Sequence, residues 1–216
     1  MNETQTKGNE DRISFIMEEI EKLSAHIKTY SVGSYPVFYL QLHSILKVQD
    51  IIEMRLSDVY ECVHGNVYVK DQIICDEKEV DLSGEDRKNL AWYAMQRIKV
   101  RNTEEEQMKK MYLCVNKQGK PLKKQVYRKM LERSSSELDL SRVYNSGYLR
   151  SLYGYLEIAY GRKTIDDIAT EYQVERYYLL NRIFKGMSIE YDSQLLNEVA
   201  NIDEADLQED RCRLHQ

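Results

Sequence analysis

Nine lysine and arginine side chains lie between Met108 and Arg133, and they form the densest group in this chain that could bind a charged ligand. Only Glu132 opposes them, so these 26 residues carry a net charge of +8. The nine are Lys109, Lys110, Lys117, Lys120, Lys123, Lys124, Arg128, Lys129 and Arg133. Such a cluster is typical of a surface that faces phosphates. The alternative is a solvated helix face whose field is cancelled by acidic segments elsewhere.

A second group that could do chemistry is Cys62 and His64, which lie two residues apart. In an extended segment they would share one face and place a thiol beside an imidazole. No acid is indicated to orient the histidine, and two ligands do not make a zinc site. The remaining cysteines form no Cys-x-x-Cys pair. We therefore expect no metal, no cofactor and no disulfide scaffold, and a reducing cytoplasm as the location.

Residues 164–182 have the pattern of a helix-turn-helix unit. In such a unit the second helix lies in the major groove and its early residues meet base edges. The expected readers are Glu175, Arg176, Tyr177 and Tyr178. Gln173 replaces the usual turn glycine, and short helical hairpins often imitate this pattern. A hairpin that reads no bases is therefore the alternative.

Apolar spacing and turn residues predict a mostly helical chain with a few short strands, which is the α+β class. Helices are expected at residues 13–27, 37–46, 49–54, 87–100, 123–133, 147–160, 164–172 and 175–184. Strand-like runs at 66–70, 73–75 and 79–82 suggest a small antiparallel β-meander, and 111–115 suggests a strand before a turn at 116–121. Breaks or connectors are expected at 31–36, 101–110 and 134–136.

Length and composition fit one globular domain with short additions. The chain has 216 residues and a net charge of −5, and no apolar run approaches the roughly 20 residues of a membrane span. Its first twelve residues are polar, so we expect no secretory signal and no membrane partner. The charge is uneven: residues 1–30 carry −2, 31–188 carry +3 and 189–216 carry −6. This distribution argues against indiscriminate coating of nucleic acid and allows a selective contact.

The run Leu46-Lys-Val-Gln-Asp-Ile-Ile-Glu-Met-Arg-Leu-Ser-Asp-Val59 resembles the first box of the tyrosine recombinase (phage integrase) catalytic domain. Tyr112 to Leu122 is similar to the family's Leu-Phe-x-Asn-x-x-Gly-x-Pro-Leu turn, with a basic helix after it. Gly147-Tyr-Leu-Arg150 resembles its His-x-x-Arg box. The resemblance covers Val37 to Phe184 and implies a fold like the tyrosine recombinase catalytic domain.

The resemblance also implies which residues would stand in the active site. In the family a tyrosine attacks a DNA phosphate, while two arginines, a lysine and histidines stabilise charge and move protons. Here Lys47 stands at the first arginine, Gly147 at the first histidine, and Arg150 keeps the second arginine.

Two further positions depart from the family. The hairpin lysine has no counterpart in residues 71–76, although Lys70 and Lys78 lie near by, and no tyrosine occurs at 181–184. Because these groups act as a unit, their loss implies loss of cleavage and leaves Lys47, Asp50 and Arg150 as catalytic remnants.

The leading hypothesis is a DNA-binding protein on a catalytically inactive tyrosine-recombinase-like fold, serving as a regulator or accessory factor of a phage or mobile element. The residues expected to contact double-stranded DNA are Lys47, Lys109, Lys110, Lys123, Lys124, Arg128, Arg150, Arg176, Tyr177 and Tyr178. One alternative is a divergent recombinase that uses Tyr177, Tyr178 or Tyr191 as a shifted nucleophile. Another is a protein-interaction module that no longer binds DNA.

Three segments are expected along the chain. Residues 1–36 would form an amphipathic helix and linker, 37–188 the recombinase-like domain, and 189–216 an acidic tail. In the family the segment after the nucleophile often docks onto a neighbouring subunit, so the resemblance implies a homo-oligomer formed through this tail.

Overall fold

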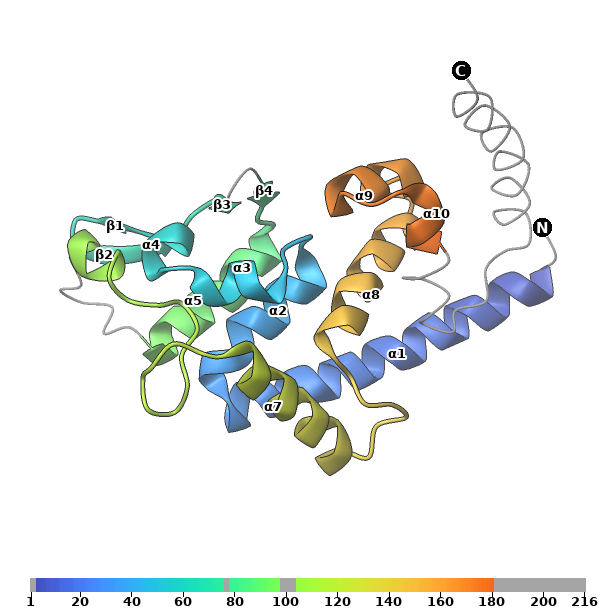
Figure 1. Ribbon diagram of the computed structural model, residues 1–216, viewed down its shortest axis with the longest axis horizontal. Helices are drawn as coiled ribbons and strands as arrows, with labels where there is room; N and C mark the ends of the chain where they lie inside the picture. Colours follow the sequence, from blue (N-terminus) through green and yellow to red (C-terminus); the bar gives the residue numbers. More distant parts are fainter. Residues whose placement is uncertain (1–2, 76–77, 98–103, 181–216) are drawn as a thin grey trace, which may run out of the picture. The chain divides into compact units, whose positions relative to one another are not determined.

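The computed structural model describes residues 3–75, 78–97 and 104–180, which form helices and two pairs of short strands (Figure 1). The chain divides into two units. Residues 17–164 form the larger unit, and residues 1–16 with 165–216 form the smaller one. The expected mostly helical α+β class is confirmed.

Most elements belong to the larger unit. Its helices are the end of α1 (Glu3–Tyr30), the 3-10 turn η1 (Val32–Ser34), α2 (Tyr35–His43), α3 (Val48–Glu53), α4 (Leu56–Val59), α5 (Gly84–Arg97), α6 (Glu105–Met108), α7 (Lys124–Glu137) and α8 (Ser146–Ala159). Its strands are β1 (Tyr60–Val63), β2 (Asn66–Val69), β3 (Gln72–Cys75) and β4 (Lys78–Asp81). The smaller unit contains α9 (Ile165–Tyr172) and α10 (Arg176–Tyr178).

The core of the larger unit is built around α2, whose residues 35–42 are all buried. A helix that is apolar on every side has to be covered on every side. The helices α3, α5 and α8 pack against it, and α1 adds Leu23 and Ile27 to the same core. Pro36 lies in the first turn of α2, where its missing N–H removes no helical hydrogen bond.

The strands form two separate antiparallel hairpins, so the predicted single meander is wrong. β1 pairs with β2 through a turn at His64 and Gly65, both of which have positive φ, and β3 pairs with β4. The N–H of Lys70 donates to the carbonyl of Val59, which continues the β1–β2 pairing and leaves β2 unpaired with β3. Strand β1 was not predicted. Since His64 lies in the turn with a positive φ, Cys62 and His64 do not share a strand face.

Three other local predictions are corrected. Residues 111–115 make only isolated bridges, Arg55 with Tyr112 and Val115 with Pro121, rather than a strand. The predicted connector 101–110 contains α6. The predicted break at 134–136 lies inside α7, because Ser135 and Ser136 donate their hydroxyls to carbonyls one turn back in the helix.

The smaller unit confirms the predicted pair of helices with a sharp turn between them. Gln173 adopts the left-handed region (φ 56°), where a glycine is usual, and the N–H of Val174 donates to the carbonyl of Ala169. The predicted helix at 175–184 is described only to residue 180, and the acidic tail at 189–216 lies outside the described residues. Among the described helices none is long and apolar enough to cross a membrane.

Gly33 allows two parts of the larger unit to approach closely. Its carbonyl accepts a hydrogen bond from the N–H of Val115 (3.3 Å), and a Cβ at this position would lie 1.9 Å from the carbonyl oxygen of Val115. The carbonyl group of Val115 belongs to the backbone, so it cannot rotate away from a side chain at position 33.

We predict that Gly33→Ala destabilises the protein by about 1–3 kcal/mol, the usual cost of overpacking. Gly84→Ala is the matched control, because a Cβ at the first residue of α5 meets nothing within 4 Å. Urea unfolding of both variants measures the difference. Equal stability of the two variants would contradict the predicted clash.

A buried carboxylate ties α1 to the loop between α7 and α8. Glu19 accepts hydrogen bonds from the N–H of Ser141 (2.5 Å), from its hydroxyl (2.7 Å) and from the hydroxyl of Tyr144 (2.8 Å). Burial alone raises the pKa of Glu19, but these hydrogen bonds and the charge of Arg142 outweigh it, and the pKa lies below its ordinary value of 4.5.

Because the pKa of Glu19 is lower in the folded chain than in the unfolded one, its charged form stabilises the fold above the unfolded pKa. That contribution is lost as the pH falls through the folded pKa. Thermal unfolding between about pH 7 and pH 3 should therefore show a smaller loss of stability on acidification for Glu19→Gln than for the unaltered protein. Glu18→Gln, at an exposed neighbour, should behave like the unaltered protein.

Candidate nucleic-acid interface

The loop between α2 and α3 is held in a fixed shape that exposes Lys47. Ser44 donates its hydroxyl to the carbonyl of Leu40 (2.5 Å) and accepts from the N–H of Leu46 (3.3 Å). Leu46 is buried and Lys47 is exposed. The apolar residue therefore anchors the loop and leaves the lysine at the surface.

Arg150 reaches this loop from α8. Its Nε donates to the carbonyl of Ile45 at 3.3 Å, two residues before Lys47. This side chain is half-buried and lies in the second turn of its helix. The fold thus brings Lys47 and Arg150, which are more than 100 residues apart, to the same loop.

Asp50 brings a third cation, Lys78, close to this loop. Its Oδ2 accepts from the N–H of Lys47 (3.2 Å) and from Nζ of Lys78 on β4 (2.9 Å). The side chains of Asp50 and Lys78 are each 15% exposed. Burial raises the pKa of Asp50. The hydrogen bonds from Lys78 and from the Lys47 amide lower it by more, so the pKa lies below its ordinary value.

We call Lys47, Lys78 and Arg150, with Asp50 between the two lysines, the basic corner. It has three cations and one carboxylate, and each cation comes from a different part of the chain. Such an arrangement can hold a phosphate oxygen, because arginine offers a planar pair of donors and lysine a compact charge.

Lys78 could not be chosen from the sequence. It and Lys70 are both near the expected hairpin position, and only the register of β3 with β4 separates them. Lys70 donates instead to the carbonyl of Ser57 (2.6 Å). The sequence does not reveal the register of this hairpin, and that register is needed to choose Lys78 over Lys70.

The structure distributes the predicted basic stretch over two places in the larger unit. Lys109 and Lys110 follow α6, where Lys109 pairs with Glu106 (2.8 Å) and Glu105 (3.4 Å). Lys123, Lys124 and Arg128 lie at the start of α7, all exposed, and Arg128 also pairs with Glu132 (3.3 Å). Buried Tyr127 and Leu131 pack this helix against the core.

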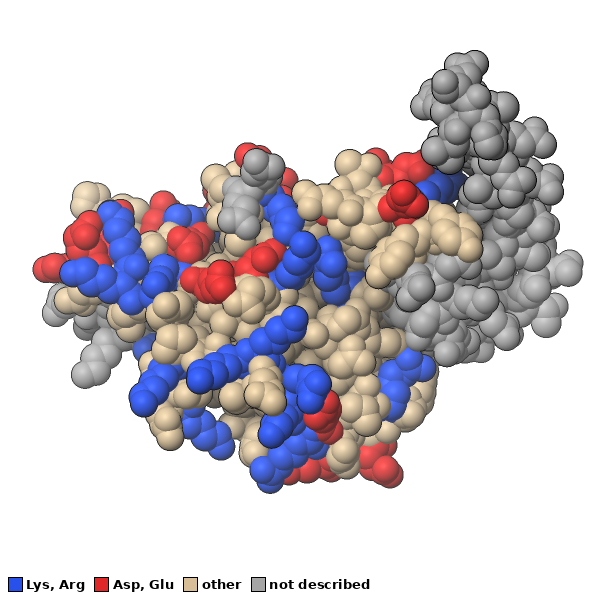
Figure 2. Space-filling view, viewed as in Figure 1, with Lys and Arg blue, Asp and Glu red and all other residues tan. Residues whose placement is uncertain are grey.

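Figure 2 shows where positive charge gathers on one face of the larger unit. Lysine and arginine side chains lie over α7, over the turn that precedes it, and beside α3 and α8 (Figures 1 and 2). Acidic side chains interrupt this pattern near α7 and near the strands. The basic surface is therefore divided rather than continuous.

Arg176, Tyr177 and Tyr178 belong to the smaller unit. Arg176 pairs with Asp166 of α9 at 3.4 Å, so its charge is partly engaged within the helical hairpin. The side chains of Tyr177 and Tyr178 are 58% and 46% exposed. Tyr191 lies outside the described residues.

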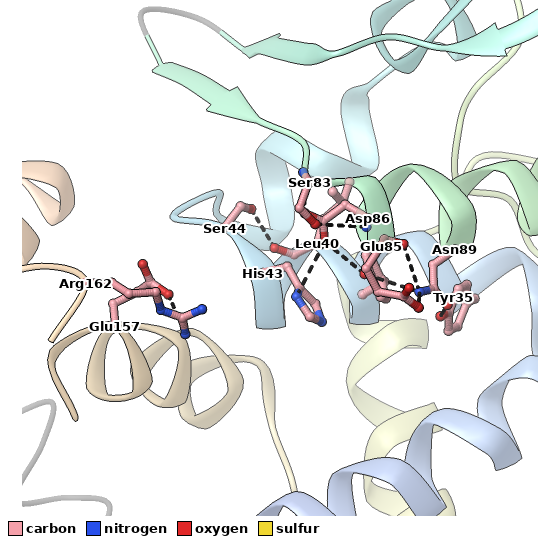
Figure 3. A network of polar contacts seen from close by, with 11 residues as sticks. Tyr35, Leu40, His43, Ser44, Ser83, Glu85, Asp86, Asn89, Glu157 and Arg162 are labelled. Atoms are coloured by element: carbon pink, nitrogen blue, oxygen red, sulfur yellow. Dashed lines mark hydrogen bonds and ion pairs between the residues drawn. The ribbon is translucent and has the colours of Figure 1, made fainter. Parts of the chain in front are cut away.

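A second polar network, which the sequence did not indicate, lies at the end of α2 (Figure 3). Asp86 accepts from the hydroxyl of Tyr39 (2.8 Å) and from the hydroxyl of Ser83 (2.6 Å), and Nδ1 of His43 lies 3.5 Å from it.

The chemistry of this network is structural. Ser83 and His43 both face the carboxylate of Asp86 rather than each other, so they do not form a serine–histidine relay. Burial lowers the pKa of His43 more than the charge of Asp86 raises it. Tyr39 and His43, whose rings stack with centres 4.2 Å apart on α2, both contact Asp86 and so fix the end of α2 against α5. The described residues contain no cluster of three side chains that could hold a metal.

The fold is that of solved tyrosine recombinases. The crystal structure of XerA recombinase matches with a TM-score of 0.58 and 13% identity, over 86% of this chain and 61% of that chain. The XerH site-specific recombinase, bound to a palindromic difH substrate in a post-cleavage complex, matches with a TM-score of 0.52 and 18% identity, over 87% of this chain and 52% of that one. This chain thus spans about half to three fifths of the length of these proteins.

A comparison of the sequence with protein-family models identifies the family. The model of the phage integrase family matches residues 9–155, which is more than half of the chain, and the protein therefore belongs to the phage integrase family. The predicted family and fold are both confirmed. No curated protein matches this chain in sequence.

We predict that Asp50→Asn destabilises the larger unit by about 1.5–3 kcal/mol, the range for a hydrogen bond to a charged partner. Asp58→Asn is the matched control: Asp58 is also the third residue of its helix and accepts from the N–H of the N-cap residue, Arg55, without a lysine, and the amide oxygen of asparagine can still accept that hydrogen bond. Urea unfolding compares the two. An equal loss in both variants would mean that the Lys78 pair adds nothing to stability.

Proposed function

We propose that this protein binds double-stranded DNA at chosen sites and does not cut it. In this proposal it is a regulator or accessory factor of a phage or mobile element and works in the cytoplasm. The observation that carries the proposal is the basic corner of a phage integrase fold. On either side of Lys47 in the chain, Arg150 donates to the carbonyl of Ile45 and Lys78 pairs with Asp50.

The chemistry of the corner supports a phosphate ligand. Arg150 stands at the arginine of the family's His-x-x-Arg box, and its Nε is oriented by the carbonyl of Ile45. Lys47 is exposed beside it. XerH, on the same fold, is bound to its DNA substrate, which supports DNA as the source of that phosphate.

The start of α7 supplies a second set of contacts in this proposal. Lys123, Lys124 and Arg128 are exposed there, on a helix that packs against the core through Tyr127 and Leu131. Contacts of this kind set the position of a protein on the duplex and make its affinity depend on salt. The net charge of −5 keeps non-specific binding weak, so sequence-dependent contacts would decide where the protein stays.

The identity of the residues argues against cleavage. Lysine at position 47 lacks the two-pronged geometry of arginine, glycine at 147 cannot move a proton, and residues 181–184 contain no tyrosine. These groups stabilise one transition state together, so the loss of several removes the reaction rather than slowing it slightly. Homo-oligomerisation through residues 189–216 remains part of the proposal.

The test is a titration with duplexes tiled across the DNA that flanks the protein's own gene. We expect affinity for one region to fall steeply with salt, and Arg150→Gln to lower both the affinity and the salt slope, the slope by about 1. Lys88→Gln, at an exposed lysine of α5, should change neither. Affinity that ignores salt, or an Arg150 variant that binds like the unaltered protein, would refute the proposed contact.

The same duplexes, nicked so that a cleaved strand is trapped, test the absence of cleavage. No covalent protein–DNA adduct is expected on a denaturing gel. An adduct that disappears with Tyr177→Phe or Tyr178→Phe would identify a shifted nucleophile and an active recombinase.

A further inference from the structure

A pocket of about 360 Å3 lies on the side of α7 away from the residues proposed to contact DNA. Its walls are the end of α1, the turn η1, the turn at 116–121 and one face of α7. Lys123, Lys124 and Arg128 do not line it. Its volume falls within the range of small-molecule sites in proteins, roughly 300–1,000 Å3.

The pocket has an apolar lining. Leu122 and Met130 line it and are buried, while Val126 in the first turn of α7 is 47% exposed. An exposed valine next to buried leucine and methionine provides a surface on which hydrocarbon can displace water. The pocket can therefore hold the apolar body of a ligand.

The wall formed by the 116–121 turn is fixed before any ligand arrives. Asn116 accepts hydrogen bonds on its side-chain oxygen from the N–H groups of Gln118 (2.9 Å) and Lys120 (3.0 Å). Gly119 holds a positive φ of 75°, which only glycine adopts without strain. Because this wall is already ordered, less conformational entropy is lost when a ligand binds.

Three cations surround this apolar lining. Nζ of Lys117 lies 4.6 Å from the ring centre of Tyr30, and the guanidinium of Arg133 lies 5.4 Å from the same ring. Lys129 is the third, one turn of α7 before Arg133. The pocket lining contains no carboxylate. Arg133 pairs with Glu137 (2.6 Å), whereas no ion pair with a described carboxylate engages Lys117 or Lys129.

We propose that this pocket binds a small organic anion. Its apolar body would lie against Leu122, Val126 and Met130, and its negative group between Lys117 and Lys129. Like charges on three neighbouring side chains raise the electrostatic energy of the empty site, and an anion relieves it. The site does not depend on DNA binding, because it shares none of the residues assigned to that role.

The probe for this site is 8-anilinonaphthalene-1-sulfonate, an anion whose fluorescence rises in apolar surroundings. Its uncharged relative N-phenyl-1-naphthylamine separates the charge requirement from the apolar one. We expect saturable binding of the sulfonate to the full chain and at least about tenfold weaker binding of the uncharged compound, as the loss of about 1.4 kcal/mol would give.

Two pairs of variants locate the site. Lys117→Ala with Lys129→Ala should weaken binding of the sulfonate about tenfold, whereas Lys120→Ala with Lys88→Ala removes the same charge outside the pocket and should leave binding unchanged. Val126→Trp should fill the pocket and abolish binding, whereas Gln125→Trp, the exposed neighbour outside the lining, should not. All these side chains are exposed, and circular dichroism checks that each variant folds.

The proposal is overturned if the sulfonate does not bind, if both compounds bind equally, or if each pocket variant matches its control. Because no DNA is present, failure here leaves the proposed DNA contact standing. Failure of the DNA titration likewise leaves this site standing.

Discussion

The burial of α2 on every side is the constraint on which the larger unit depends. Eight consecutive residues, 35–42, are buried in a helix of only nine residues. Water has to be excluded from its whole circumference, so α1, α3, α5 and α8 are all arranged around it. The chain returns to the surface at His43, which lies beside both the Asp86 network and the loop that carries Lys47.

The end of α2 determines where the residues of the neighbouring surface lie. The imidazole of His43 stacks on Tyr39 and approaches Asp86, while Ser44 turns the backbone towards Lys47. Arg150 then contacts the same turn from α8. A buried helix thus sets the position of an exposed lysine through fewer than five intervening residues, with little freedom for the loop to move.

The sequence predicted those parts of the fold that depend on local pattern. The apolar spacing of α1 and the turn at 116–121 have local signals, and the family boxes around Lys47 and Arg150 are recognised by their order and spacing along the chain. It failed where serine hydroxyls bond within a helix and where strand pairing decides. Ser134 to Ser136 read as a break, because serine favours turns, yet their hydroxyls bond within α7 and two of them are buried. The division of the strands into two hairpins depends on backbone pairing that side-chain types do not specify.

The same limit applies to the candidate site. Lys47, Asp50 and Arg150 follow from motif positions, whereas the choice of Lys78 over Lys70 requires the hairpin register. The pocket beside α7 has no sequence motif at all, because residues from α1, η1, a turn and α7 meet there only after folding. Charge counting located the lysines but could not separate those at the start of α7 from those that surround the pocket.

Asp50 has a further consequence for any ligand of the basic corner. Its carboxylate already pairs with Nζ of Lys78 at 2.9 Å, so the protein carries a tethered counter-ion at the place proposed to bind a phosphate. A phosphate that arrives there exchanges with this carboxylate rather than filling an empty place, and a single phosphate gains little from the exchange. A duplex that also contacts α7 gains from several phosphates at once. The tethered counter-ion would therefore act as a threshold, rejecting isolated phosphates and nucleotides while admitting a polymer.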